Sequence, residues 1–263
     1  MSSIRPVVLC FSGHDPCGGA GLQADIEVLI SHRCHAATVV TALTEQDTHN
    51  IRKVIPQTAA EFKAQALTIL SDLPVKVIKI GLLGSYDIIL AVQKILQAYP
   101  NIPVVFDPIL AAGGGMHLAD DDLRQAMIER ILPHTFICTP NSHEARQLTQ
   151  LDDLKACGRA LLEMGCKNVL LTGAHEDTRA VRNQLFRPEE TVETFTWERL
   201  GHQYHGSGCT LASSIAALLA HDLDCFVAVS EAQEYTWNAL SKAYPTGTGQ
   251  YNPNRFFWVD DEN

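Results

Sequence analysis

The sequence VVLCFSGHDPCGGAGLQADIEVLI occupies residues 7–30 and contains three consecutive patterns. Its first five residues are all apolar, as in a strand that is buried on both faces. A glycine-rich turn follows, and then Leu22, Ile26, Leu29 and Ile30 recur at the spacing of one helix face. A buried strand joined to a helix by a short turn is typical of the opening of a fold with a parallel sheet.

The same alternation of strand and helix continues to the end of the chain. It predicts an α/β fold: one domain over residues 1–263, with a doubly wound, mostly parallel sheet and helices on both faces. Residues 183–199 are expected to form an antiparallel hairpin instead. The expected strands are 36–43, 75–80, 104–106, 136–138 and 168–172, and the expected helices are 58–71, 85–98, 120–131, 141–148, 153–164, 209–221 and 225–243.

Composition limits the kind of partner. The 263 residues include 20 Lys+Arg against 30 Asp+Glu, which gives a formal net charge of -10. That balance argues against nucleic-acid binding and against a polybasic membrane anchor, because both need a basic face. No run approaches the roughly 18 apolar residues of a membrane span. The 8 cysteines include no C-x-x-C pair, so we expect reduced thiols and a soluble, cytoplasmic protein.

In a doubly wound fold, ligands bind at the carboxyl ends of the strands, so the loops there are the candidate site. The first loop covers residues 12–25 and matches neither the Walker A pattern nor the dinucleotide-binding pattern. Its glycines, beginning with Gly13, allow either close approach to a ligand or a tight turn, and both interpretations remain open. Asp25 lies one turn into the next helix, where a carboxylate also suits the helix dipole.

Two further loops carry single polar side chains. Gln46 follows the second strand and offers both a donor and an acceptor, as the edge of an aminopyrimidine requires. An exposed loop glutamine is the alternative. Asp107 ends the strand at 104–106, ahead of the glycine run 113–115, and there it can hold Mg²⁺ or orient a phosphate.

The fourth loop opens a short helix. Asn141 and Glu144 have the spacing of a capping box, in which each side chain accepts a hydrogen bond from the other residue's backbone. The same oxygen atoms suit Mg²⁺ and the phosphates that it carries. The residues alone do not separate the structural role from the binding role.

The fifth loop gives the most specific signal. His205-Gly206-Ser207-Gly208-Cys209-Thr210 opens a helix, where successive backbone N–H groups and the helix dipole form an anion site. The same field is expected to lower the thiol pKa of Cys209, and a thiolate there could accept an alcohol proton. A glycine turn beside a small packed cysteine is the alternative.

The loops, taken in order, resemble those of a known family. The matching segments are residues 13–25, 41–48, 79–81, 106–108, 139–144 and 206–210. In this order they resemble the motifs of bacterial hydroxymethylpyrimidine/phosphomethylpyrimidine kinases, which belong to the ribokinase-like superfamily. The resemblance extends from residue 7 to about residue 240, and the joint occurrence of the motifs is more specific than any one of them.

The resemblance implies ATP-dependent phosphorylation of 4-amino-5-hydroxymethyl-2-methylpyrimidine and then of its monophosphate, in thiamine biosynthesis. By motif, Gln46 would contact the pyrimidine, with Gly13 and Asp25 nearby. ATP phosphates and Mg²⁺ would be held by Asp107, Asn141, Glu144 and Thr172, with Asp107 and Glu144 as the metal ligands. The anion hole for the transferred phosphoryl group would be Gly206, Ser207, Gly208 and Cys209. The family also suggests a homodimer.

Three positions depart from the common family pattern. Lysines of the family are replaced by Ala112, Thr172 and Gln233, and the expected substitutes are Arg179, Arg182 or a second metal ion. Two rival functions follow: a pyridoxal kinase of the same superfamily, and a catalytically inactive sensor that binds the pyrimidine. Gln46 favours the aminopyrimidine over pyridoxal.

Overall fold

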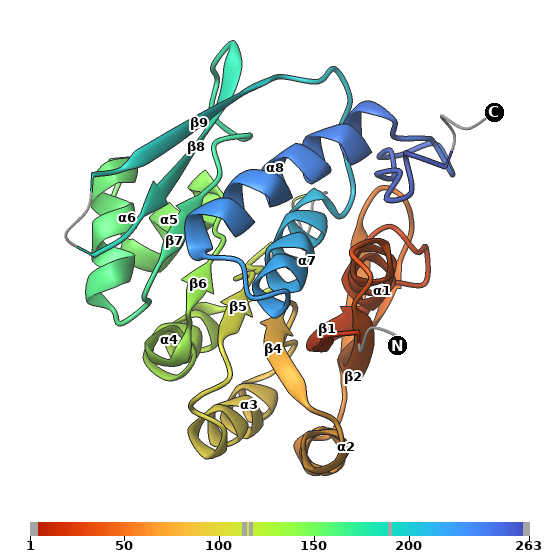
Figure 1. Cartoon of the computed structure of the whole chain (residues 1–263), viewed down its shortest axis with the longest axis vertical. Helices are drawn as coiled ribbons and strands as arrows, with labels where there is room; N and C mark the ends of the chain where they lie inside the picture. The colour runs from red at the N-terminus through yellow and green to blue at the C-terminus, as the bar shows by residue number, and fades with distance from the viewer. Residues whose placement is uncertain (1–4, 112–114, 116–117, 189–190, 260–263) are drawn as a thin grey trace.

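The computed structural model describes residues 5–111, 115, 118–188 and 191–259. In this part of the chain one sheet has the strand order β3-β2-β1-β4-β5-β6-β7-β8-β9 (Figure 1). The strands are β1 (Val7–His14), β2 (His35–Gln46), β3 (Ile51–Pro56), β4 (Val75–Ile80), β5 (Val104–Phe106), β6 (Ile137–Cys138), β7 (Val169–Leu171), β8 (Ala180–Phe186) and β9 (Glu193–Glu198).

The strand order confirms the predicted doubly wound sheet. Strand β1 pairs in parallel with β2 on one side and with β4 on the other, and β4 to β7 continue in parallel. The antiparallel pairing of β8 with β9 confirms the hairpin expected at 183–199. The order reverses between β1 and β4, and folds of this class open a ligand crevice at such a reversal.

The strand β3 is absent from the sequence prediction, which ends the second strand at residue 43. Strand β2 instead runs to Gln46 and pairs with β3 in an antiparallel ladder, with Gln46 opposite Ile51. Strand β3 lies at the sheet edge and exposes Arg52 and Lys53, so its sequence lacks the apolar alternation of a half-buried strand. Gln46 is therefore fixed at a strand end and does not lie in a free loop.

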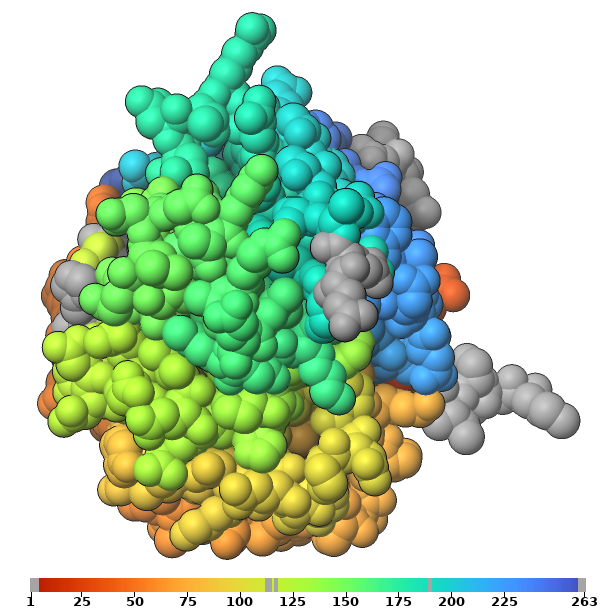
Figure 2. Space-filling model, turned by 90° about the vertical axis from the view of Figure 1, so that its left-hand side faces the viewer, coloured from red at the N-terminus to blue at the C-terminus, as the bar shows by residue number. Residues whose placement is uncertain are grey.

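Helices cover both faces of the sheet, as predicted. One face carries α1 (Gly21–Ser31), α7 (Ser207–Ala220) and α8 (Cys225–Ser241). The other carries α2 (Ala59–Asp72), α3 (Tyr86–Ala98), α4 (Asp121–Arg130), α5 (Ser142–Thr149) and α6 (Leu154–Glu163). Figure 2 shows part of the outer surface of this second layer, where the yellow to green segments are α3 to α6.

The core lies between the sheet and each helix layer. Along β1, Leu9 and Phe11 pack with the α2–α6 layer, whereas Val8 and Cys10 pack with α1, α7 and α8. Burial on both faces explains why this strand is a continuous apolar run. No helix in the described ranges is long and apolar enough to cross a membrane.

Two helices begin without a side-chain cap. Helices α2, α3, α4, α5, α6 and α8 each have a Thr, Ser, Asp or Asn whose side chain accepts a hydrogen bond from the first turn. Helices α1 and α7 follow Ala20 and Gly206 and have no such bond. Their first N–H groups are left for another partner, and both ends face the same cavity.

Candidate active site

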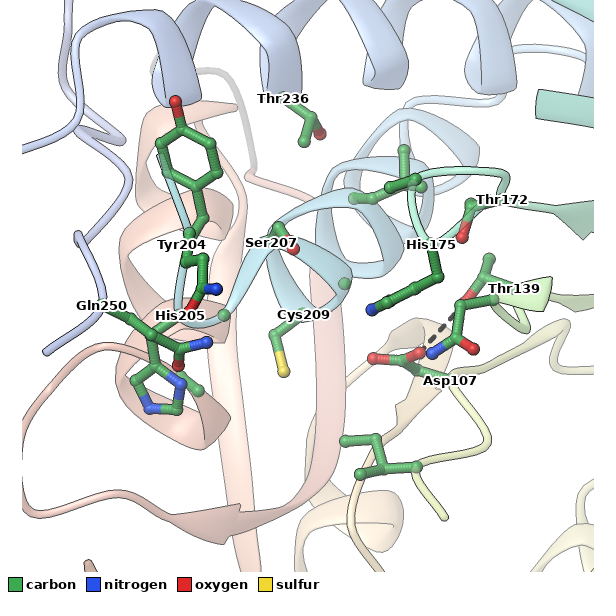
Figure 3. A pocket seen from close by; sticks show the side chains of 18 of the residues that line it. Asp107, Thr139, Thr172, His175, Tyr204, His205, Ser207, Cys209, Thr236 and Gln250 are labelled. Carbon is green, nitrogen blue, oxygen red and sulfur yellow. Dashed lines mark hydrogen bonds between the residues drawn. The ribbon is translucent and has the colours of Figure 1, made fainter. Parts of the chain in front are cut away.

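A cavity of about 700 Å³ opens at the carboxyl ends of the parallel strands, beside the start of α7 (Figure 3). It brings together residues that are separated by more than half of the chain. The predicted site residues that line it are Gly13, Gln46, Asp107, Asn141, Glu144, Thr172, Gly206, Ser207, Gly208 and Cys209.

Asp25 is the one predicted site residue that does not line the cavity, so the expectation that it lies near the pyrimidine gains no support from this structure. It has no exposed surface. Its Oδ1 accepts hydrogen bonds from Lys79 Nζ at 2.8 Å and from Ser213 Oγ at 2.7 Å. Burial alone would lower the pKa of Lys79, but the charge of Asp25 raises it above the ordinary value. Asp25 therefore holds a charged lysine inside the protein.

Asp15 organises the glycine-rich loop. Its carboxylate accepts hydrogen bonds from the N–H groups of Cys17 at 2.7 Å, Gly19 at 3.0 Å and Ala20 at 2.8 Å. His205 Nε2 lies 2.8 Å from Asp15 Oδ2, which ties this loop to the segment before α7. Burial alone would raise the pKa of Asp15, but hydrogen bonds, led by that of His205, lower it to about 2. Asp15 therefore stays ionised.

The glycines of this loop serve close packing. A side chain at Gly19 would overlap the ring of His205, and one at Gly21 would overlap the carbonyl oxygen of Gly13. Gly21 also has a φ of 57°, in the left-handed region that favours glycine. The tight-turn interpretation is thus confirmed, and it brings the backbone of Gly13 and Gly21 to the cavity wall.

The start of α7 forms the part of the cavity wall next to the glycine-rich loop. Gly206 has a φ of 78°, and a side chain there would overlap the carbonyl oxygen of Gly19. A β-carbon built at Gly208 would lie 3.5 Å from Asp107 Oδ2. Figure 3 shows Ser207 and Cys209 in this first turn, with Asp107 across from them. Uncapped N–H groups and a nearby carboxylate therefore meet at one point of the cavity.

Burial changes the expected state of Cys209. The side chain is 6% exposed, and burial raises the pKa of its thiol to about 11, although Lys79 acts in the opposite direction. The sequence predicts a lowered thiol pKa from the helix end alone, and that prediction is wrong. The largest cause is the loss of solvent around the sulfur, and the charges of Asp107 and Asp25 act in the same direction. Cys209 is a protonated thiol at neutral pH.

Asp107 and Glu144 are a second buried acidic group. Thr139 Oγ1 donates to Asp107 Oδ1 at 3.4 Å. Burial raises the pKa of Asp107 to about 6, and burial followed by the charge of Asp107 raises the pKa of Glu144 to about 8. Neither carboxylate forms an ion pair with Lys, Arg or His in the described ranges. The pair is an acidic site that lacks a cation in contact with it.

The capping box predicted at Asn141 is present. Asn141 Oδ1 accepts from the N–H groups of His143 and Glu144, both at 2.9 Å, and Glu144 Oε2 accepts from Asn141 N at 2.9 Å. This confirms the structural role. Because a carboxylate has about four lone-pair positions, the cap does not prevent Glu144 from binding another group.

Gln46 lies on the cavity wall near the glycine-rich loop. Its carbonyl oxygen accepts a hydrogen bond from Cys17 Sγ at 3.3 Å, and its side-chain amide is among the groups that lower the pKa of Asp15. The position agrees with the predicted place for reading a ring edge. The contact with a pyrimidine stays a prediction.

Gln233, one of the three positions where the family pattern has a lysine, is the centre of a buried hydrogen-bond network. Gln233 Oε1 accepts from Asn183 Nδ2 at 2.8 Å and from Trp197 Nε1 at 3.1 Å, and Asn183 Oδ1 accepts from Gly173 N at 3.0 Å. This buried network joins α8, β8, β9 and the loop after Thr172. Ala112 lies outside the described residues.

The two arginines that were expected to replace the family lysines do not line the cavity. Arg179 and Arg182 are absent from its wall, and Arg182 alternates with Val181 and Asn183, which do line it. Arg199 lines it instead. Its guanidinium donates to three backbone carbonyl oxygens, those of Ala174, Glu176 and Thr178, at 2.7–2.9 Å.

The motifs do not single out Asp15, His205 or Arg199, which line the cavity, nor Lys79, which is fully buried and does not line it. Asp15 and His205 are polar residues inside quoted motifs, and Lys79 is a charged residue in an apolar strand, so each carried a usable signal. Arg199 follows the end of β9 and has no local pattern to distinguish it.

Comparisons with known proteins agree with the fold. A bifunctional thiamine-biosynthesis protein of Geobacter sulfurreducens is 33% identical over 262 residues, covering 98% of this chain and 54% of that protein. The chain thus spans about half of that relative. The hydroxymethylpyrimidine/phosphomethylpyrimidine kinase of Escherichia coli is 34% identical over 242 residues, covering 89% of this chain and 91% of that protein.

A solved structure, an ADP complex of Bacillus subtilis pyridoxal kinase, superimposes with a TM-score of 0.91. It is 26% identical and covers 97% of this chain and 99% of its own. The fold is that of a ribokinase-like kinase. A sequence model for phosphomethylpyrimidine kinase matches residues 15–254, and the chain belongs to that family.

Proposed function

We propose that this chain uses ATP to phosphorylate 4-amino-5-hydroxymethyl-2-methylpyrimidine and then its monophosphate, giving the diphosphate that enters thiamine. The family membership supports this reaction. The observation that carries it is that the uncapped start of α7, the buried acidic pair and Gln46 line one cavity. A hydroxymethyl group on a flat ring bound at Gln46 would point toward the N–H groups of residues 206–209.

The backbone of α7 supplies the main stabilisation of the reaction. Negative charge spreads over the equatorial oxygens of the transferred phosphoryl group, and preorganised N–H groups are well suited to bind it. Cys209 contributes a neutral S–H group and does not act as a resting base, because its pKa is raised to about 11. Phosphoryl transfer needs mostly positioning, so a strong base is not required.

The acidic pair fits a magnesium ion. Mg²⁺ in kinase sites is held by one or two carboxylates together with substrate phosphates and water. Asp107 and Glu144 are buried carboxylates without an ion-pair partner in the described ranges, which is the donor set that this cation needs. When bound, the ion neutralises phosphate charge. Asn141 and Thr172 lie on the same wall, where the nucleotide phosphates would pass.

The test is product analysis. The purified chain is incubated with the aminopyrimidine, ATP and Mg²⁺, and the mono- and diphosphate are separated and weighed by mass spectrometry. The variant Gln46→Ala should raise the KM for the pyrimidine by roughly 5- to 150-fold, because about 1–3 kcal/mol is lost when buried ligand groups go unpaired. The surface variant Gln125→Ala is the matched control. Absence of pyrimidine phosphate in the wild-type reaction would reject the function.

Pyridoxal is a second candidate substrate. The TM-score of 0.91 with the Bacillus subtilis pyridoxal kinase favours it, because that enzyme has nearly the same backbone. The same assay with pyridoxal separates the two: the ratio of kcat/KM values decides which substrate the cavity prefers. Turnover of either substrate rejects the alternative of an inactive sensor.

We also propose a homodimer in the cytoplasm. Leu43 and Ile55 are cross-strand partners on β2 and β3, each 42% exposed, beside the edge of the sheet. An exposed apolar pair at a strand edge is a typical pairing surface. None of the cysteines forms a disulfide in the described structure, which suits a reducing compartment. Light scattering of Leu43→Lys against wild type tests the dimer.

A further inference from the structure

Arg255 is a buried cation in a segment that none of the functional motifs includes. It follows α8, and 2% of its surface is exposed. The segment that leads to it is fixed at two points beside the cavity. Tyr251 O accepts from His205 N at 2.9 Å, and Gln250 N donates to Thr48 O at 2.9 Å. The segment therefore connects the turn after β2 with the loop before α7.

The guanidinium of Arg255 joins three elements. Its Nε donates to Thr210 Oγ1 at 3.0 Å, its Nη1 donates to Glu27 Oε2 at 2.9 Å, and its Nη2 donates to Gly19 O. Thr210 Oγ1 in turn donates to Gly206 O at 2.8 Å. One side chain thus connects the first turn of α7, helix α1 and the glycine-rich loop.

These contacts leave little room for the loops to shift. A β-carbon at Gly206 would overlap Gly19 O and would lie 2.9 Å from Arg255 Nη2. Asp15 holds the N–H group of Gly19 at 3.0 Å while Arg255 holds its carbonyl oxygen. The peptide groups on both sides of Gly19 are therefore fixed, and the start of α7 is packed against them.

We propose that Arg255 is a positioning residue for phosphoryl transfer: it sets the place of the N–H groups of residues 206–209 relative to the glycine-rich loop. The proposal rests on the proposed function, because those groups are the anion hole. Arg255 does not line the cavity and does not act on substrate directly. Lysine cannot replace it fully, because the planar guanidinium donates in three fixed directions.

The effect should fall on kcat. The N–H groups of residues 206–209 act most strongly on the transition state, whereas Gln46 and the nucleotide wall bind the ground state. A displacement of about 1 Å in such a group costs up to about 100-fold in rate. A purely structural arginine would instead lower stability and leave the kinetic constants of the folded fraction unchanged.

The experiment compares Arg255→Met, Arg255→Lys and Glu27→Gln with a matched control, Arg130→Met. Arg130 joins α4 to Gln93 and Tyr86 in the opposite helix layer. With active-site concentration measured, Arg255→Met should lower kcat by roughly 10- to 100-fold, with both KM values within about twofold of wild type. Arg255→Lys should recover part of the loss, and Arg130→Met should retain wild-type kcat.

Hydrogen–deuterium exchange provides a readout that needs no substrate. Arg255→Met should speed exchange in peptides covering residues 17–21 and 205–210, and Arg130→Met should not. Unchanged kcat in Arg255→Met overturns the proposal, as does unchanged exchange in these peptides. Should wild type phosphorylate neither the pyrimidine nor pyridoxal, the proposed function fails and exchange alone decides. Should Arg255→Met not fold, Glu27→Gln takes its place, and an unchanged kcat there overturns the proposal.

Discussion

Asp25 and the Asp107–Glu144 pair are buried within one region of the molecule, but their charges are balanced in different ways. Asp25 accepts from Lys79 at 2.8 Å and Ser213 at 2.7 Å, so the protein supplies its counter-charge. Asp107 accepts a longer bond from Thr139, and Glu144 accepts from a backbone amide. Asp25 thus has a buried cation in contact with its Oδ1, although its Oδ2 accepts no hydrogen bond, whereas Asp107 and Glu144 have no basic side chain in contact within the described ranges. This difference supports the proposal that Asp25 has a structural role and that Asp107 and Glu144 bind a cation.

The variant Lys79→Met should give the largest effect. It leaves the carboxyl group of Asp25 buried without its cation, and breaking a buried pair costs about 3–5 kcal/mol. Urea unfolding measures the loss. Asp25→Asn should cost a similar amount, and the pair Lys79→Met/Asp25→Leu should cost less than the two single changes together. A loss below about 1 kcal/mol in Lys79→Met would mean that the pair is not the counter-charge described here.

The variant Asp107→Asn should lower activity and should not lower stability, in contrast to Lys79→Met. Removing a charge that has no partner in the protein should leave the free energy of unfolding unchanged or higher, while kcat falls by about 10²- to 10³-fold, as for loss of one transition-state stabiliser. Steady-state kinetics with denaturation on the same sample checks both. Asp87→Asn, on exposed α3 surface, is the control. Full activity in Asp107→Asn would remove the acidic pair from the mechanism.

Magnesium should stabilise the second acidic region and not the first. At about 100 times its dissociation constant, a ligand that binds only the folded state adds about 2.7 kcal/mol. Denaturation with and without Mg²⁺ should show this gain in wild type and in the control Asp87→Asn, and little of it in Asp107→Asn. An equal gain in Asp107→Asn would place the metal elsewhere.

Asp15 should give the smallest effect, and a pH dependence. Its pKa falls from 3.8 to about 2 because the hydrogen bonds from His205, Gln46 and the loop amides outweigh burial. A lowered carboxyl pKa stabilises the folded state above pH 4, and this contribution is lost as the pH falls toward 2. On the order of 1–2 kcal/mol should disappear over that interval. Asp15→Asn should flatten this part of the curve, and an unchanged curve would contradict the assignment.

Much of the fold can be predicted from local sequence patterns. Most residues of the cavity wall can be predicted because they follow the ends of predicted strands. The apolar runs predict β1 and β4 to β7, and Asp107 and Gly206 to Cys209 lie where those strands and α7 place them. Strand β3 is not predicted, because the charged residues at this sheet edge interrupt the alternation of apolar and polar residues. The contact of Asp25 with Lys79 cannot be predicted from local spacing, because the two residues lie 54 positions apart in the sequence.

The state of Cys209 shows a second limit of the sequence. A glycine turn before a helix reports the sign of the helix field, which would lower the thiol pKa. The burial of the sulfur depends on how segments far apart in the sequence pack around it. That burial is the largest cause of the raised pKa. Gln233 on α8 is similar, since its role comes from a hydrogen bond with Asn183 on strand β8, 50 residues away in the sequence.

The contact between Arg255 and Gly19 also bears on how the molecule is made. The two residues are 236 positions apart, close to the full length of the chain. Contacts of such sequence separation form late, because the loop that they close costs the most entropy. During synthesis, the strands and helices can assemble while residue 255 is still inside the ribosome, but the contacts of Arg255 with Gly19 and Thr210 cannot yet form. A growing chain would therefore form its sheet and helices before the start of α7 is fixed against the glycine-rich loop.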